Sequence, residues 1–292
     1  MNKYFAICPR GLEELLSQEL TALGAQYLRS THGGVHFSGD WALCYRANLE
    51  SRIATRILWF IAQGGYRSED DIYKLAAKQS WPDFFNVTRT MRVATTAIKC
   101  PLKSLDFVTL RVKDAVCDSF RSRFNERPNI ETRNPDVRVH VFLTENECTL
   151  YLDTSGQPLW QRGFRKASVD APLKENLAAG ILKMTGWQPG MALVDPMCGS
   201  GTFLLEAIQM ALDIAPGLER TFAFELLSSF EAQTWSALLR AAEARCKTPE
   251  PLEIRGYDID ETAARATRKN PQEAGSGGIV TVACAHVIET EP

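Results

Sequence analysis

A short loop at residues 194–202 carries the strongest chemical signal in this sequence. It reads Val-Asp-Pro-Met-Cys-Gly-Ser-Gly-Thr and follows an apolar stretch, residues 192–195, that predicts a short strand. A helix is expected to begin at Phe203, so the order is strand, glycine loop, helix. Glycine lets the backbone approach a ligand closely, and a helix N-terminus presents N–H groups to it. The loop therefore predicts a ligand-binding site.

The glycine spacing and the neighbouring acid limit the choice of ligand. The loop lacks the GxGxxG spacing of dinucleotide-binding folds, which disfavours a nicotinamide cofactor, and the GxxxxGK[ST] pattern of P-loops is absent. Asp195 ends the strand beside the loop, where its carboxylate would repel a phosphate and attract an ammonium group. S-adenosylmethionine carries both an ammonium and a sulfonium. It is therefore the expected cofactor.

A second acid is expected at the end of the next strand, where it would accept hydrogen bonds from ribose hydroxyls. Residues 254–258 predict such a strand, which ends at Asp258, and helix capping is the alternative role for this residue. Asp260 is expected to cap the helix 261–269. Since the usual gap between loop and acid is about 20 residues, residues 213–252 must contain inserted structure. The predicted cofactor contacts are Asp195, Pro196, Cys198, Gly199, Ser200, Gly201, Thr202, Asp258 and Ile259.

The elements around this site indicate an α+β front half and an α/β rear half. Residues 1–50 show the order strand, helix, strand, strand, helix, which is typical of a ferredoxin-like module. Further strand and helix patterns fill residues 51–155. Residues 156–172 are rich in turn formers and cations and predict a linker. Residues 173–292 are expected to form the first part of a Rossmann-like sheet.

The front half also contains a basic segment. Residues 86–140 hold eleven Lys/Arg and six Asp/Glu, a net charge of +5, whereas residues 171–292 hold ten and sixteen, a net charge of −6. Within the basic segment, residues 106–124 predict an amphipathic helix, in which Phe107, Leu110, Val116, Phe120 and Phe124 are expected to share one face. Such a segment is where a polyanion would bind, although a solvated helix face is an equal alternative. The predicted RNA contacts are Arg111, Lys113, Arg121, Arg123, Arg162 and Arg165.

Composition excludes several classes of protein. The chain is 45% hydrophobic and 23% charged, which excludes a wholly disordered chain, and no apolar run approaches the roughly 18–20 residues of a membrane helix. The eight cysteines form no CxxC pair and there are four histidines, so no metal site is expected. The N-terminal residues lack the pattern of a signal peptide. A cytoplasmic protein with reduced thiols is therefore expected.

Several separate segments resemble those of class I RNA methyltransferases that also carry a THUMP domain, an RNA-binding domain that would correspond to residues 51–155. Taken together, the chain resembles the N-terminal part of large-subunit rRNA guanine-N2 methyltransferases. The segments that carry the resemblance are the ferredoxin-like start 1–50, the link 162–165, the pre-strand segment 171–179, the glycine loop 194–202 and the insert segments 215–218 and 222–225.

This resemblance implies a substrate, 23S rRNA, and a reaction. The exocyclic amine of a guanine would attack the methyl group on the sulfonium in a single displacement, with positioning as the main contribution of the protein. The target base would have to be turned out of its stack to reach the methyl group. In the family, an Asn-Pro-Pro-aromatic loop after the fourth strand holds that amine.

The sequence departs from the family pattern in its last part. It contains no Asn-Pro-Pro-aromatic motif, and Asn270-Pro271 is interpreted as a helix terminator. After the strand expected at 278–284, His286 stands where the family places an aspartate that contacts the adenine amine. We therefore expect about three strands of the usual seven, no catalytic residue in the chain, and a truncated domain.

Two alternatives to an rRNA methyltransferase remain open at this point. One is a plain RNA-binding protein, in which the THUMP-like half functions and the cofactor half does not. The other is a related methyltransferase that acts on guanine N2 in tRNA or on adenine in DNA. A DNA enzyme has no need of the THUMP-like residues 51–155, which argues against DNA.

Overall fold

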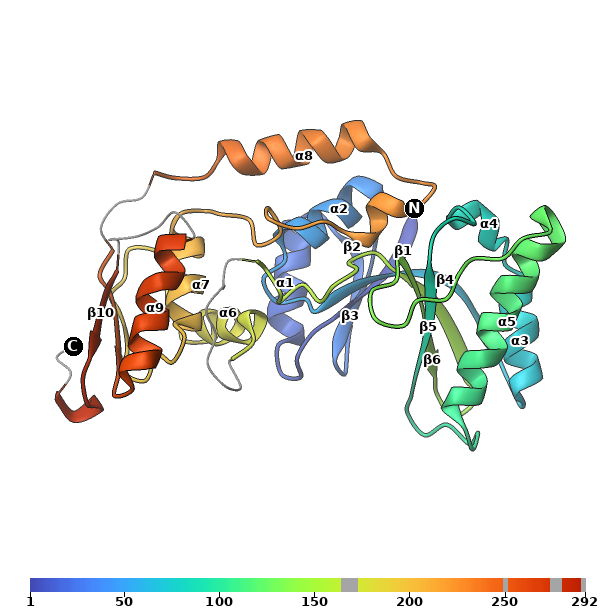
Figure 1. Ribbon diagram of the computed structural model, residues 1–292, viewed down its shortest axis with the longest axis horizontal. Coiled ribbons are helices and arrows are strands. Elements are labelled where there is room, and N and C mark those ends of the chain that lie inside the picture. The colour runs from blue at the N-terminus through green and yellow to red at the C-terminus, as the bar shows by residue number, and fades with distance from the viewer. Residues whose placement is uncertain (164–172, 249–251, 274–279, 290–292) are drawn as a thin grey trace.

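The computed structural model describes residues 1–163, 173–248, 252–273 and 280–289 (Figure 1). The elements of its front half are β1 Asn2–Ile7, α1 Glu13–Ala22, β2 Gln26–Thr31, β3 Gly34–Gly39, α2 Trp41–Glu50, β4 Arg56–Gly65, α3 Glu69–Ala77, α4 Trp81–Phe84, β5 Met91–Ala97, α5 Leu105–Phe124, β6 Val137–Leu143 and β7 Glu147–Asp153. Those of its rear half are α6 Glu175–Met184, β8 Leu193–Asp195, α7 Thr202–Ala211, the 3-10 turn η1 Ala223–Leu226, α8 Ala232–Ala244, β9 Ile254–Asp258, α9 Glu261–Glu273, β10 Thr281–Cys284 and the 3-10 turn η2 Val287–Glu289.

The strands of the front half form one continuous sheet with the order β2-β3-β1-β4-β7-β6-β5. All neighbours are antiparallel except β5 and β6. Strand β4 pairs with β1 on one side and with β7 on the other. This central strand therefore joins the ferredoxin-like module to the second mixed region, so that the two share a single hydrophobic core.

Helix α5 occupies the span that its periodicity predicted, but its buried face differs from the predicted one. Val108, Val112 and Phe120 are fully buried, whereas Phe107, Leu110 and Phe124 are each about half exposed. Counted at 100° per residue, Phe107 and Leu110 lie on the opposite side of the helix from Val108 and Val112. The prediction that the three exposed residues line the buried face was wrong, because the smaller valines pack against the sheet and α3.

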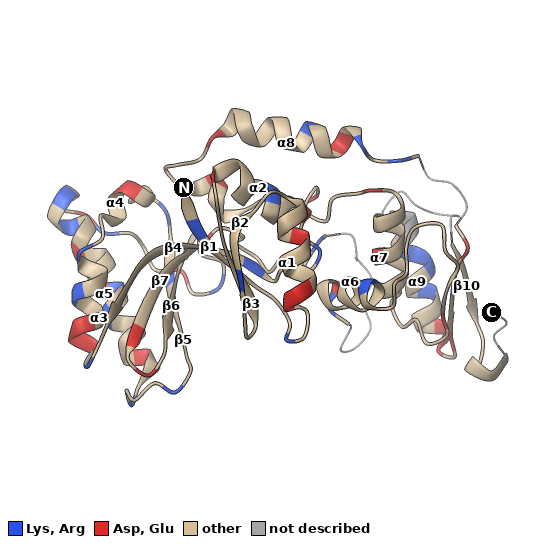
Figure 2. Cartoon of the chain, turned by 180° about the vertical axis from the view of Figure 1, so that it is seen from behind, with Lys and Arg blue, Asp and Glu red and all other residues tan. Residues whose placement is uncertain are grey.

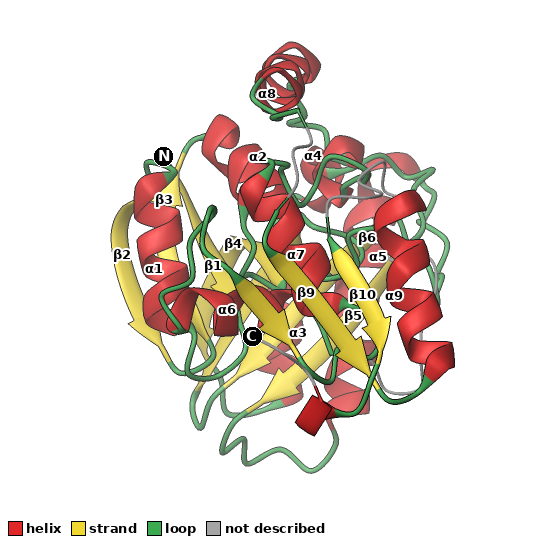
Figure 3. Ribbon diagram, turned by 90° about the vertical axis from the view of Figure 1, so that its left-hand side faces the viewer, coloured by secondary structure: helices red, strands yellow, loops and turns green. Residues whose placement is uncertain are grey.

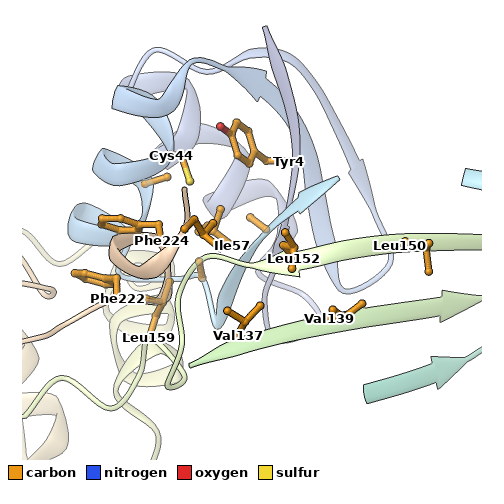
Figure 4. Close-up of a cluster of buried hydrophobic side chains, with 14 of the residues drawn as sticks. Tyr4, Cys44, Ile57, Val137, Val139, Leu150, Leu152, Leu159, Phe222 and Phe224 are labelled. Carbon is orange, nitrogen blue, oxygen red and sulfur yellow. The ribbon is translucent and has the colours of Figure 1, made fainter. Parts of the chain in front are cut away.

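The predicted insert between α7 and β9 packs on the front half of the molecule. Phe222 and Phe224 of this insert lie in the same core as Tyr4 and Cys44, as Figure 4 shows. Phe224 also lies 4.5 Å, centroid to centroid, from the ring of Tyr45 in α2. Helix α8 lies along α2 (Figure 1). The insert therefore ties the rear half of the chain to the ferredoxin-like module.

The rear half contains a parallel three-stranded sheet with the order β10-β9-β8, around which α7 and α9 pack (Figure 3). Its three strands, joined through α7 and α9, are those expected of a Rossmann-like sheet. Helix α9 continues through Asn270 and Pro271 to Glu273. The interpretation of Asn270-Pro271 as a helix terminator was therefore wrong: Pro271 cannot donate to the carbonyl oxygen of Thr267, but the loss of this one hydrogen bond does not end the helix at Asn270.

Two further properties of the described residues concern the expectations from composition. All eight cysteines are free thiols. No described helix has the length and apolar character that crossing a bilayer requires.

Figure 1 places α3 and α5 at one end of the long axis and the three-stranded sheet at the other.

Candidate cofactor-binding site

The glycine loop joins β8 to α7 at the carboxyl end of the three-stranded sheet. Gly199 and Gly201 have φ angles of 55° and 79°, a left-handed conformation that favours glycine. Gly201 is the residue that caps the N-terminus of α7. A Cβ on Gly201 would also lie 2.7 Å from the Cγ2 atom of Thr267. The loop thus needs glycine at this position both for its backbone angle and for space.

Asp258 meets the glycine loop directly. It ends β9, the strand beside β8, and its Oδ2 atom accepts a hydrogen bond of 2.8 Å from the N–H group of Gly199. Its Oδ1 atom accepts one of 3.0 Å from the N–H group of Asp260. Each carboxylate oxygen has a second lone pair. Asp258 can therefore accept further hydrogen bonds from a ligand that lies against the loop.

Asp195 and Asp258 together give this end of the sheet a negative charge. Burial raises the pKa of Asp195, and the neighbouring Asp258 raises it further, while the N–H group of Met197 acts in the opposite direction. A carboxylate such as Asp195, whose ionisation burial and a second acid oppose, is stabilised in its charged form by a cationic ligand. The electrostatics of the site therefore favour an ammonium or sulfonium group over a phosphate.

The predicted cofactor contacts differ in their exposure to solvent. The side chains of Cys198, Ser200 and Thr202, in and just after the glycine loop, are buried. Burial raises the pKa of the Cys198 thiol to about 11, so this cysteine is not a thiolate nucleophile at neutral pH. Ile259 is 69% exposed next to Asp258, where its apolar side chain is available to a flat ring.

Helix α9 contributes two residues that the sequence analysis missed. The hydroxyl of Thr267 donates to the carbonyl oxygen of Gly199 at 2.7 Å. The side-chain amide of Asn270 donates to the carbonyl oxygen of Ser200 at 3.0 Å. Both side chains are fully buried. Polar residues three apart on one face of α9 were the available signal. Asp260 has the capping role predicted for it, because its Oδ1 atom accepts from the N–H group of Thr262 at 2.8 Å.

The predicted RNA contacts do not share one surface. Arg162 was predicted to contact RNA, and that prediction was wrong: its side chain is 1% exposed and its Nη1 atom lies 2.6 Å from Oε2 of Glu206 in α7. Arg165 lies outside the described residues. The other four lie on α5, where basic and acidic segments occur side by side (Figure 2). Each contacts an acid, the pairs being Arg111–Asp70, Lys113–Asp114, Arg121–Asp118 and Arg123–Asp83.

Comparison with known proteins assigns a family to each part of this geometry. Residues 3–58 match the RlmL ferredoxin-like domain, residues 66–153 match the THUMP domain, and residues 162–291 match the RMKL-like methyltransferase domain. The three matched ranges follow one another along nearly the whole chain. The chain belongs to the THUMP-containing methyltransferases.

Individual relatives agree with this assignment. The chain is 44% identical over 280 residues to the ribosomal RNA large subunit methyltransferase K/L of Cellvibrio japonicus, which covers 92% of the chain and 37% of that protein. The chain thus spans little more than a third of this curated relative.

Two solved structures resemble the whole chain. Each superposition takes in about three quarters of the other protein's chain. One is the structure of a predicted N6-adenine-specific DNA methylase from Listeria monocytogenes. It superposes with a TM-score of 0.90 at 29% identity, over 100% of this chain and 76% of the methylase chain. The other, SMU.472, a putative methyltransferase complexed with SAH, superposes with a TM-score of 0.90 at 26% identity and covers 100% and 77%. Both support the Rossmann-like assignment of the rear half.

Replacement of Gly201 by alanine tests the loop geometry. We expect Gly201→Ala to lower the free energy of unfolding by about 1–3 kcal/mol, because the φ angle is unfavourable and the new Cβ meets Thr267. The displaced loop should also weaken S-adenosylmethionine binding, measured by calorimetry. Gly186→Ala is the matched control: its φ is 76° and it has open space around it. If both variants weakened ligand binding equally, the loop would not be the site.

Proposed function

We propose that the chain binds S-adenosylmethionine at the glycine loop and serves the methylation of guanine N2 in 23S rRNA. The single observation that carries this is the meeting of Asp258 with the Gly199 N–H group beside Asp195, in a chain whose front half matches a THUMP domain. The rRNA methyltransferase K/L relative supports rRNA as the substrate. The SAH complex of SMU.472 supports the cofactor.

In this proposal each group at the site has a separate task. Bound S-adenosylmethionine supplies an electrophilic methyl group. Asp258 accepts hydrogen bonds from the ribose hydroxyls, and Ile259 covers one face of the adenine. Asp195 attracts the ammonium group of the methionine part. Gly199 and Gly201 let the backbone of the loop approach the ligand, and Thr267 and Asn270 hold that backbone from beneath.

The proposed RNA partner binds through the front half. The predicted contacts on α5 are Arg111, Lys113, Arg121 and Arg123. RNA phosphates would compete for each of these cations with the acidic partner described above. We propose no catalytic residue within the 292 residues, since they contain no Asn-Pro-Pro-aromatic sequence to hold the guanine amine. The alternative is an RNA-binding protein part without methyl transfer, which this same absence favours.

Calorimetry with S-adenosylmethionine, together with transfer of a labelled methyl group to 23S rRNA, tests this proposal. We expect saturable binding of the cofactor by the chain and no incorporation of label. Incorporation would contradict the absence of catalytic residues while supporting the reaction. An RNA-binding chain without cofactor affinity would contradict the methyltransferase assignment and leave the RNA-binding alternative.

A further inference from the structure

One face of the seven-stranded sheet carries no helix among the described residues. Helices α1, α2, α3 and α5 all pack against the sheet. Cross-strand pairing places the residues beneath them on one common face: Tyr4 pairs with Trp59, Trp59 with Leu152, and Leu152 with Val139. Figure 4 shows Tyr4, Leu152 and Val139 within this core. Because side chains alternate along a strand, the intervening residues lie on the opposite, helix-free face.

An aromatic band crosses this helix-free face. Phe5 pairs with His36 across β1 and β3, and Tyr151 pairs with Phe60 on one side and with His140 on the other. The rings are in contact: Phe5 lies 4.6 Å from His36 and 6.2 Å from Tyr151, and Phe60 lies 6.0 Å from Tyr151, measured between centroids. Tyr151 is buried yet belongs to no part of the main core. The band thus forms a second apolar surface that the fold itself does not cover with a helix.

Cations without acidic partners flank the band. They are Lys3, Arg29, Arg92 and Arg138, and none forms an ion pair within the described part of the chain. Lys3 lies over the ring of Phe60, with its Nζ atom 5.8 Å from the centroid. On neighbouring strands, Arg29 lies opposite His36, and Arg92 lies opposite Arg138. The acid Asp153 on this face is already bound to Arg56.

Arg138 lies on this face without an acidic partner of its own. Its Nε atom is buried and has no hydrogen-bond partner. Burial lowers the pKa of Arg138, and the neighbouring cations Arg56 and Arg92 lower it further, while Asp153 acts in the opposite direction. A cluster of like charges with an unsatisfied donor is stabilised when an anion binds. The cations of α5, by contrast, each contact an acid.

We propose that this helix-free face binds a single-stranded segment of the RNA substrate, with bases stacked on the partly exposed rings of Phe5 and Phe60, which Tyr151 supports from within the band, and phosphates held by the flanking cations. The inference rests on the proposed function and names the surface through which the front half takes its RNA. Aromatic rings recognise the faces of unpaired bases, which a double helix keeps stacked inside. Six strand spacings of about 4.8 Å make the face about 29 Å wide, which accommodates several nucleotides.

Fluorescence anisotropy with a labelled, unstructured RNA of about 12 nucleotides and with its duplex form tests the proposal. We expect the single strand to bind more tightly than the duplex. Phe60→Leu should weaken it about 5- to 150-fold, the range seen for loss of one stacking ring. Arg138→Gln should weaken binding and reduce its salt dependence. The matched control is Phe107→Leu on the helix-covered side, which should bind like the parent chain, and Arg121→Gln tests the alternative contacts on α5.

The outcomes separate this inference from the proposed function. RNA binding that Phe107→Leu and Arg121→Gln weaken, but Phe60→Leu and Arg138→Gln do not, would overturn the face and leave the function standing. A parent chain that binds S-adenosylmethionine but no RNA would overturn both. Thermal unfolding checks each variant. If Phe60→Leu fails to fold, the exposed pair Lys3→Gln and Arg29→Gln tests the same face through its flanking cations and leaves the rings of the band in place.

Discussion

Asp258→Ala is expected to bind S-adenosylmethionine at least about 100-fold more weakly than the parent chain, as measured by calorimetry. The loss has two physical sources. The variant removes the charged acceptor proposed for the ribose hydroxyls. It also leaves the N–H group of Gly199 without its 2.8 Å hydrogen bond, so that the glycine loop loses a support.

Two matched variants separate these roles. Asp260→Ala removes the cap of α9 two residues away, so it should cost about 1 kcal/mol of stability and leave the cofactor affinity close to that of the parent chain. Asp258→Asn keeps an oxygen for Gly199 but loses the negative charge, and it should fall between the parent and Asp258→Ala. If Asp260→Ala and Asp258→Ala were indistinguishable in calorimetry, Asp258 would be a structural cap and not a cofactor contact.

Arg162→Met should lower the free energy of unfolding by about 3–5 kcal/mol, because it leaves the carboxylate of Glu206 buried without its main partner. Glu206 is fully buried, and the remaining cation, Arg52, lies farther away, with its Nη1 atom 3.7 Å from Oε2. Arg52 in turn donates to the carbonyl oxygen of Ile214 at 2.5 Å, just beyond α7. These arginines hold the helix whose other end carries the glycine loop.

Urea denaturation of a small set of variants checks this expectation. The exposed pair Arg121–Asp118 is the control, and Arg121→Met should cost no more than about 1 kcal/mol. The double variant Arg162→Met with Glu206→Leu should regain part of the loss, since no unpaired carboxylate remains and only Arg52 loses its partner. A loss below about 1 kcal/mol for Arg162→Met alone would show that water or Arg52 satisfies Glu206, and the junction would not depend on this pair.

The same junction shows where prediction from sequence reached its limit. Arg162 stands in a segment rich in cations and turn formers, so nothing in its neighbours along the chain distinguishes it from a surface residue. Its burial arises because Glu206, 44 residues later, and the backbone oxygen of Arg52, 110 residues earlier, come to the same point. Asn270 was misread for a similar reason. Its partner, the carbonyl oxygen of Ser200, lies 70 residues away.

Local spacing was sufficient wherever the relevant interactions are local. The sequence alone determined the strand, glycine loop and helix of the proposed cofactor site, the acid at the end of the next strand, and the order of the elements in the front half. Backbone angles and hydrophobic periodicity depend on residues a few positions apart, and these are visible in one chain. The family resemblance added the expected substrate and reaction.

The tertiary structure decided which side chains face each other and which are covered. Only it showed that β4 joins the two front modules into one sheet, that Val108 and Val112 take the buried face of α5 in place of Phe107 and Leu110, and that the insert packs on α2. It also showed that no described helix covers the aromatic band and its flanking cations on the seven-stranded sheet. Burial depends on which distant segment closes over a residue, and periodicity within one element carries no information about that segment.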